Sequence, residues 1–291
     1  MDLPHGQRVW CRDRWLDLSS PRVMGVINVT PDSFSDGGRF VRPEGEDIDL
    51  EAVEAAAIGM ITEGATLLDI GGESTRPGAT FVDDADECAR VLPVIQRLVG
   101  LGVVLSIDTR KTAVARQALD AGCHFVNDIS AGQDDGMLRL IAQTGAGLCL
   151  MHMRGVPATM QAAPVYDEVF NEVTEFLELR AKLAMKAGVR REQIVLDPGI
   201  GFGKRFEHNL ELLKRLEDIG VLGFPVLVGV SRKSTIGQIT GRSVQERMAG
   251  SVAMAVLAAE RGARIIRAHD VAATVDGIAV QQAVRREMDR R

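Results

Sequence analysis

The side chains best suited to chemistry come directly after short apolar runs that are spread along the whole chain. Eight such runs end in a polar or charged group, at Asn28, at Asp69, at Asp108, at Asn127 and Asp128, at His152, at Asp197, at Ser231 and Lys233, and at Arg267 and His269. A polar or charged group at the end of a strand that is buried on both faces is unfavourable for folding, because the group loses its hydration there. The eight termini therefore predict one shared rim of polar groups.

Three members of this rim predict a particular kind of ligand. Asp108, Asn127 and Asp197 end separate apolar runs, and two carboxylates and an amide that converge in a pocket need donors. A heterocycle with several N–H groups would supply those donors. A metal cluster is the alternative, although histidines are sparse at these positions. Asp108 alone has a further alternative, as the cap of a helix that begins near Lys111.

Other residues of the rim and its loops predict an anion site. Arg267 and His269 are two residues apart, so on an extended segment they point the same way and form an anion clamp. Ser231 and Lys233 have the same spacing. Thr75 and Arg76 lie in the glycine-rich segment GGESTRPGA, whose backbone can approach a phosphate closely. The alternative for that segment is an ordinary surface loop.

Two loops are predicted to complete the pocket. Residues 28–38, NVTPDSFSDGG, place the apolar side chain of Phe34 in a loop with Pro31 and two glycines, which is typical of a lid that closes over a ligand. The alternative is a solvated turn with Phe34 packed against the body of the protein. Residues 197–204, DPGIGFGK, lack the glycine spacing of the common phosphate-binding motifs. We interpret them as a turn that carries Phe202 toward the pocket.

The elements that must position these residues alternate between strand and helix. An amphipathic helical stretch follows nearly every apolar run, which predicts parallel strands joined by helices. Eight such units predict a (β/α)8 TIM barrel with its active site at the carboxyl ends of the strands, and an open doubly wound sheet is the alternative. We expect one domain over residues 1–291, with the barrel over about residues 22–286. Pro93 predicts a kink or a break in its helix.

The segment before the first barrel strand predicts a short β-hairpin over residues 8–18. In it, Val9 and Trp10 face Trp15 and Leu16 across a polar turn. Because the hairpin precedes the first strand, it can cover the bottom of the barrel. The two tryptophans are therefore expected to pack rather than to act in the site.

Composition excludes several classes of protein. The chain has 291 residues, 46% hydrophobic and 25% charged, with a net charge of -6, which argues against a general nucleic-acid binder. No apolar run approaches the ~18 residues that span a membrane, and the N-terminus has no apolar signal core. We therefore expect a cytoplasmic location with no nucleic-acid or membrane partner. The four cysteines form no CxxC pair and are expected to be buried free thiols, with no structural zinc site.

At this point the motifs together resemble a known family. The segments GVINVTPDSFSDGG, DIGGESTRPGA, SIDT, VNDIS, LMHMRG, LDPGIGFGK, VGVSRKS and RAHD occur in the order seen in the dihydropteroate synthases, over roughly residues 22–275. The resemblance implies a transferase that joins 6-hydroxymethyl-7,8-dihydropterin diphosphate to 4-aminobenzoate and releases diphosphate, through a dissociative step with a pterin-methyl cation. It also implies a Mg²⁺ ion, a homodimer and a target of sulfonamides.

The same resemblance implies a role for each site residue. The pterin would be held by Asp108, Asn127, Asp197 and Lys233. The diphosphate would be held by Asn28, Thr75, Arg267 and His269, with Asn28 also at the metal. The 4-aminobenzoate pocket would be bordered by Phe34, Pro77, Phe202 and Ser231. The catalytic set would be Asp108, Lys233, Arg267, Asp32 and Arg76.

Some residues and alternatives remain open at this stage. Asp69 and His152 receive no role beyond positioning their loops. A methyltransferase acting on methyltetrahydrofolate would share the pterin-holding strand ends, but it needs no diphosphate clamp or aminobenzoate lid. A non-catalytic paralogue with the same fold is the alternative from a different functional class.

Overall fold

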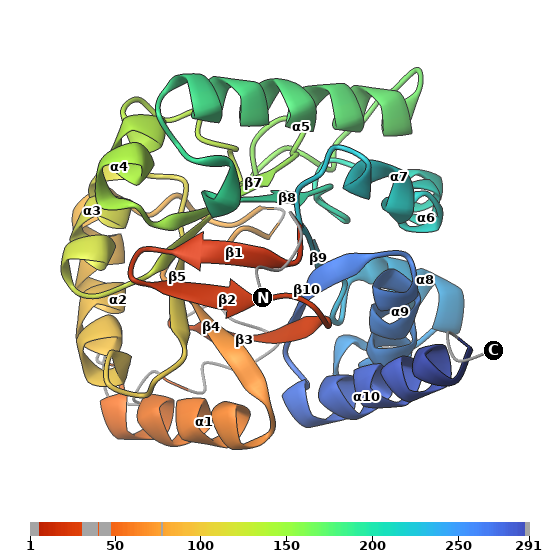
Figure 1. Cartoon of the computed structure of the whole chain (residues 1–291), viewed down its shortest axis with the longest axis horizontal. Helices are drawn as coiled ribbons and strands as arrows, with labels where there is room; N and C mark the ends of the chain where they lie inside the picture. Colours follow the sequence, from red (N-terminus) through yellow and green to blue (C-terminus); the bar gives the residue numbers. More distant parts are fainter. Residues whose placement is uncertain (1–5, 31–39, 41–47, 77, 289–291) are drawn as a thin grey trace.

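The main body of the protein is a closed barrel of eight parallel strands (Figure 1). The computed structural model describes residues 6–30, 40, 48–76 and 78–288. The barrel strands are β3 (Arg22–Asn28), β4 (Ala65–Gly71), β5 (Val104–Asp108), β6 (Phe125–Asp128), β7 (Gly147–Met151), β8 (Ile194–Asp197), β9 (Val226–Gly229) and β10 (Ala263–Ala268). They follow one another in chain order around the barrel, and β10 closes it by pairing with β3. The predicted TIM barrel is confirmed.

Helices between the strands surround the barrel, as Figure 1 shows. They are α1 (Leu50–Thr62), α2 (Asp84–Leu98), α3 (Thr112–Asp120), α4 (Met137–Thr144), α5 (Val169–Lys186), α6 (Phe206–Lys214), α7 (Leu216–Gly220), α8 (Ser234–Thr240), α9 (Met248–Glu260) and α10 (Val271–Met288). Short 3-10 turns cover Arg191–Gln193 and Val244–Glu246. In α2, Val91, Ile95 and Leu98 recur at helical spacing and are fully buried. This apolar stripe holds the helix on the sheet.

Three helical segments differ from the sequence-based expectation. Pro93 lies inside α2, which continues through it, so the predicted break is wrong. Val94 and Ile95, which directly follow the proline, are fully buried and hold the helix in place. The stretch HNLELLKRLEDIG forms two helices, α6 and α7, which are separated at Arg215 with φ -103 and ψ 21. The short helix α8 directly after SRKS had no predicted counterpart.

The N-terminal hairpin closes the bottom of the barrel. Strands β1 (Arg8–Cys11) and β2 (Arg14–Asp17) are antiparallel, and Val9 pairs with Leu16 while Trp10 pairs with Trp15. Val9, Cys11 and Leu16 are buried in one cluster with side chains from all eight barrel strands. In Figure 1 the hairpin lies across the end of the barrel. The predicted hairpin and its covering role are both confirmed.

The barrel interior is arranged in layers. The lowest layer contains one apolar residue from each strand, namely Met24, Leu67, Val104, Phe125, Cys149, Val195, Leu227 and Ile265. Because strand side chains alternate between faces, the residue two positions further along each strand also points inward. That second layer is Val26, Asp69, Ser106, Asn127, Met151, Asp197, Gly229 and Arg267. The interior therefore changes from apolar to polar over about one layer of side chains.

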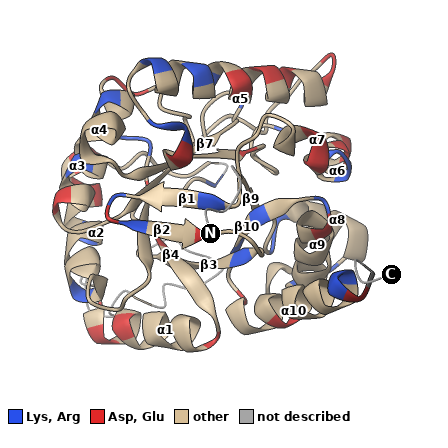
Figure 2. Ribbon diagram, viewed as in Figure 1, with Lys and Arg blue, Asp and Glu red and all other residues tan. Residues whose placement is uncertain are grey.

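The outer surface carries charges of both signs. Figure 2 shows acidic and basic residues interspersed along the outer helices, for example on α5. The four cysteines are all buried free thiols, as predicted. None of the described helices has the length and apolarity needed to cross a membrane.

Candidate active site

Asp69, which the sequence left without a role, is the centre of the polar layer. Its Oδ2 accepts hydrogen bonds from Arg267 Nε at 2.6 Å and from Asn127 Nδ2 at 2.9 Å, and its Oδ1 accepts from Ser106 Oγ at 2.5 Å. The Asp69 side chain is fully buried, and its three donors come from three other strands. A buried carboxylate with this many donors holds them in fixed orientations. Asp69 therefore positions both Asn127 and Arg267.

Asp108 stands beside this network with one oxygen available. Its Oδ2 accepts from Arg267 Nη2 at 2.9 Å, whereas its buried Oδ1 has no hydrogen-bond partner among the described residues. Burial raises the pKa of the Asp108 carboxyl to about 7, against the lowering effect of the Arg267 charge. An unpartnered buried carboxylate oxygen is costly, and a ligand N–H would satisfy it.

Asp108 does not cap the helix that follows it. The residue at the N-cap of α3 is Lys111, and the backbone N–H of Thr112 donates to Asp134 Oδ2 at 2.6 Å. The capping alternative for Asp108 is therefore wrong, and its carboxylate remains in the barrel mouth.

Asp197 and Lys233 form the opposite wall of the site. Asp197 Oδ1 accepts from the backbone N–H of Gly199 at 2.7 Å, and burial raises the pKa of its carboxyl. Lys233 Nζ donates to the carbonyl of Ile200 and lies 4.3 Å from the centre of the Phe202 ring. Burial lowers the Lys233 pKa to about 8, while the charge of Asp197 acts in the opposite direction.

The space between Asn28 and Asp108 depends on a glycine. A Cβ atom on Gly71 would lie 3.2 Å from Asn28 Oδ1 and 3.7 Å from Asp108 Cβ. Any side chain there would therefore fill the gap between the ends of β3 and β5. The gap leaves the amide oxygen of Asn28 facing the same space as the Asp108 carboxylate.

His269 and Ser231 contact each other at the rim. The backbone N–H of His269 donates to Ser231 Oγ at 3.2 Å, and His269 Nδ1 lies 3.0 Å from the same oxygen. Burial, together with the positive charges of Arg267, Arg232 and Arg76, lowers the His269 pKa to about 3. The imidazole is therefore neutral at ordinary pH, and it can donate a hydrogen bond to an anion but adds no charge.

The segment SRK is a turn and not an extended strand. Arg232 has φ 57, and its guanidinium pairs with Asp270 at 2.6 and 3.1 Å. Ser231 consequently lies against His269 of the β10 end, whereas Lys233 reaches the turn after β8. The expectation that these two side chains point the same way is wrong, because the left-handed residue between them reverses the alternation.

A buried lysine holds the glycine-rich turn that carries Phe202. Lys204 Nζ donates to the carbonyls of Gly199 at 2.9 Å, Phe202 at 3.0 Å and His152 at 3.2 Å. It also lies 3.0 Å from His152 Nδ1. Burial lowers the His152 pKa to about 3, and burial also lowers the Lys204 pKa well below its usual value, so the imidazole is neutral where it contacts the amine. This contact gives His152 a supporting role that the sequence did not reveal.

The remaining predicted site residues lie on the loops. Thr75 and Arg76 are partly buried on the connection between β4 and α2, and the charge of Arg76 is close enough to affect His269. Asp32, Phe34 and Pro77 lie outside the described residues.

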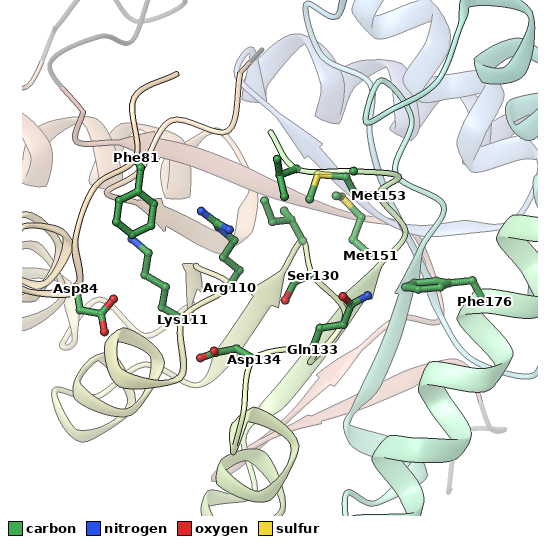
Figure 3. A pocket seen from close by; sticks show the side chains of 13 residues that line it. Phe81, Asp84, Arg110, Lys111, Ser130, Gln133, Asp134, Met151, Met153 and Phe176 are labelled. Carbon is green, nitrogen blue, oxygen red and sulfur yellow. The ribbon is translucent and has the colours of Figure 1, made fainter. Parts of the chain in front are cut away.

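A cavity of about 430 Å³ opens beside the polar layer, over the ends of β5, β6 and β7. Figure 3 shows Met151 and Phe176 on one side of it and Phe81, Arg110 and Lys111 on the other. Its volume is within the range of small-molecule sites. At the centre of the barrel itself, the Arg267 side chain occupies the space between Asp69 and Asp108.

Comparison with known proteins shows the family to which the chain belongs. The model of the pterin binding enzyme family matches residues 24–269. The dihydropteroate synthase of Escherichia coli (strain K12) is 47% identical over 269 residues, which are 92% of this chain and 93% of the relative.

Two solved structures extend the comparison to the fold. The Yersinia pestis dihydropteroate synthase in complex with a sulfonamide drug is 45% identical, with a TM-score of 0.90, and the match covers 96% of this chain and 99% of that one. The Xanthomonas albilineans dihydropteroate synthase with 4-aminobenzoic acid is 48% identical, with a TM-score of 0.87, and the match covers 96% and 98%. This chain therefore belongs to the pterin-binding enzyme family, among the dihydropteroate synthases.

Proposed function

We propose that the protein condenses 6-hydroxymethyl-7,8-dihydropterin diphosphate with 4-aminobenzoate to form 7,8-dihydropteroate and diphosphate. The observation that carries this proposal is the polar cluster at the barrel mouth, where Arg267 pairs with Asp108 and Asn127 donates to Asp69. The charges of Asp197, Arg267 and Asp108 all act on Lys233 in the same cluster. The dihydropteroate synthase relatives with this fold support it.

The pterin ring would be recognised by complementary hydrogen bonds. The free Oδ1 of Asp108 and the Asp197 carboxylate accept from ring N–H and amino groups. Asn127 donates to Asp69, which leaves its amide oxygen for the ligand. Lys233 donates to a ring oxygen or nitrogen. Each group is already oriented by the protein, so little ordering is needed on binding.

The diphosphate would lie toward Arg267, His269, Thr75 and Asn28. Since His269 is neutral, the positive charge on this side comes from Arg267 and Arg76. Both can donate planar pairs of hydrogen bonds to phosphate oxygens.

A Mg²⁺ ion fits this arrangement. Magnesium prefers oxygen ligands and is commonly held by one or two protein groups together with substrate phosphates. The Asn28 amide oxygen, which faces the gap that Gly71 leaves open, is such a ligand. When bound, the ion would neutralise charge on the departing diphosphate.

The reaction follows from the properties of the leaving group. Departure of diphosphate from the pterin methylene leaves a cation that is delocalised into the ring. Arg267 stabilises the leaving anion, and the Asp108 carboxylate stabilises the cation electrostatically. The aniline nitrogen of 4-aminobenzoate then attacks the methylene carbon and loses a proton. A strong base is unnecessary because the electrophile is highly reactive.

Exclusion of water is the second requirement, because water would otherwise capture the cation. Arg76 belongs to a loop that we propose to close over the site, together with the loop of Asp32 and Phe34. Phe202 and Ser231 lie next to Lys233 and His269 respectively, and with Phe34 and Pro77 they would border the aminobenzoate.

We also propose a homodimer that acts in the cytoplasm. Helices α9 and α10 pack side by side and expose Met248, Leu257, Val280 and Val284, which a second copy would cover. The four free thiols are typical of a reducing compartment. Because the Yersinia pestis relative was solved with a sulfonamide, we propose that this protein also binds sulfonamides in place of 4-aminobenzoate.

The direct test is formation of 7,8-dihydropteroate by the purified protein, followed by chromatography and mass spectrometry. We expect product with both substrates and Mg²⁺, and a large loss of product when the ion is chelated. Absence of product under all conditions would indicate a non-catalytic paralogue. Product that is insensitive to chelation would refute the Mg²⁺ proposal alone.

Binding order provides a second test. Because loops contribute to both pockets, 4-aminobenzoate should bind poorly until diphosphate or the pterin substrate is present. Calorimetry that gives equal affinity with and without diphosphate would contradict this order.

A further inference from the structure

The connection between β4 and α2 is tied together at its base. Glu73 lies at its start and Val82 at its end, and Glu73 Oε1 accepts from the backbone N–H of Val82 at 3.3 Å. Arg90 Nη1 donates to the carbonyl of Gly72 at 3.0 Å. Thr75 and Arg76 lie between these ends, so the placement of both depends on this base.

A lysine from a different connection joins the two ends. Lys111 Nζ lies 3.3 Å from Glu73 Oε2 and donates to the carbonyl of Val82. It also pairs with Glu87 Oε2 of α2 at 2.7 Å and lies 4.8 Å from the centre of the Phe81 ring. Figure 3 shows the Lys111 side chain extended toward the Phe81 ring.

These contacts are shielded from water. Lys111 is 8% exposed and Glu87 is fully buried. In such surroundings a charged hydrogen bond is strong and sensitive to geometry. Glu87 Oε1 has no hydrogen-bond partner within the described part of the chain. Glu87 therefore holds Lys111 through its other oxygen, Oε2.

Lys111 is also linked to the pterin side of the site. It lies three residues after Asp108, in the short connection from β5 to α3. Lys111 therefore connects the β4–α2 connection to the strand end that carries Asp108.

On the proposed function, we infer that Lys111 is a positioning residue that fixes the loop of Thr75 and Arg76 relative to Asp108. It couples the pterin side of the site to the side that binds diphosphate and 4-aminobenzoate. A purely structural role would require only the pair of Lys111 with Glu87. The additional contacts to Glu73 and the Val82 carbonyl involve the loop itself.

The main test is the double variant Lys111→Met/Glu87→Met, which replaces the buried ion pair with apolar side chains. Glu73 loses Lys111 but keeps its pair with Arg110 Nη2 at 3.5 Å. We expect the KM for 4-aminobenzoate to rise at least tenfold, while the Kd of the pterin substrate changes less than threefold and the thermal midpoint stays close to that of the parent. Arg116→Met, an exposed cation on the same helix, is the control and should change none of these quantities.

Two further variants keep the inference testable. Glu73→Gln retains the Lys111–Glu87 pair and weakens the contacts of Glu73 with Lys111 and with Arg110 Nη2, so it should raise the same KM even if the double variant does not fold. Lys111→Arg can still donate to a carboxylate and a carbonyl and should restore a KM within about threefold of the parent. Folded variants with parental KM values would overturn the inference.

Amide hydrogen exchange separates this inference from the proposed function. Exchange over residues 78–83 of the substrate-free protein should be at least tenfold faster in Glu73→Gln than in the parent, and unchanged in Arg116→Met. This result does not depend on turnover. An inactive parent protein would therefore refute the function alone, and unchanged exchange in Glu73→Gln would refute the positioning role alone.

Discussion

The lower and upper halves of the barrel interior are built from the same eight strands and hold opposite kinds of side chain. At the lower end, Leu67, Phe125 and Ile265 are fully buried apolar residues packed in one cluster with the hairpin. Two positions further along the same strands are Asp69, Asn127 and Arg267. The lower half therefore stabilises the fold by burying apolar side chains. The polar groups of the upper half lose hydration on folding, and in return they are held in position to bind a ligand.

The difference shows how the upper half remains folded. Two of its buried carboxylates, Asp69 and Asp108, share one guanidinium, that of Arg267. Burying a charge without a partner is strongly unfavourable, so Arg267 is both a candidate catalytic group and a structural necessity. In the lower half no single residue has two such tasks.

The largest expected effect is that of Arg267→Ala. Turnover should fall by about a thousandfold or more, because the leaving anion loses its main charge partner. The free energy of unfolding should also fall by about 3 kcal/mol, since two buried carboxylates are left unpaired. Steady-state kinetics and urea denaturation measure the two losses.

Arg264→Ala is the matched control, because Arg264 lies three residues earlier on the same strand, is partly buried, and donates to the carbonyl of Ser19 at 3.4 Å and to no buried carboxylate among the described residues. It should change stability by less than about 0.5 kcal/mol and leave activity at the parental level. Lys233→Ala should abolish turnover with less destabilisation than Arg267→Ala, because burial already disfavours the charged form of Lys233.

Leu227→Ala tests the lower half of the barrel. Truncating this fully buried side chain should lower the free energy of unfolding by about 3 kcal/mol. The kcat and KM of the protein that remains folded should stay within about twofold of the parent. A tenfold fall in kcat at a temperature where the variant is fully folded would show that the two halves are not separable in function.

The pH dependence of kcat/KM tests the charges of the upper half. Asp108 must be ionised to accept from the pterin, so activity should fall as pH decreases below about 7. Lys233 must be protonated to donate, so activity should fall again as pH rises above about 8. Each limb should approach a tenfold change per pH unit. Lys233→Arg should remove the alkaline limb, and a flat profile in the parent would contradict both assignments.

The smallest effect expected is a gain in stability from Asp108→Asn, at the expense of activity. Burial raises the folded-state pKa of Asp108 from its ordinary value of 3.8 to about 7. The folded protein therefore retains a proton that the unfolded chain releases between these values, and this group makes stability fall as pH rises through that window. Denaturation at pH 5, 6, 7 and 8 should show that the free energy of unfolding of the variant increases relative to that of the parent up to about pH 7. Asp120→Asn, at the exposed end of α3, should show no such trend.

Much of this arrangement could be predicted from the chain alone, because strand periodicity is local. The ends of β5 and β8 at Asp108 and Asp197 follow from apolar runs bounded by loops, and so does the pairing of Val9 with Leu16 in the hairpin. Closure of the barrel brings these separate ends together without any further information from the sequence.

The features that escaped prediction depend on contacts between distant strands. Asp69 resembles any other polar strand residue until Ser106, Asn127 and Arg267 converge on it. His152 gains its role from Lys204, 52 residues later in the chain. Arg232 reverses the alternation of its segment through a left-handed backbone, which no side-chain pattern reveals.

The hairpin beneath the barrel has a consequence for synthesis of the chain. The floor it covers includes Ile265 of β10, and the barrel closes only when β10 pairs Ile265 with Arg22 of β3. The hairpin precedes every barrel strand in the chain, yet it is among the last segments to find its complete binding surface. Val9 and Cys11 must remain exposed to solvent or to chaperones until β10 has been made.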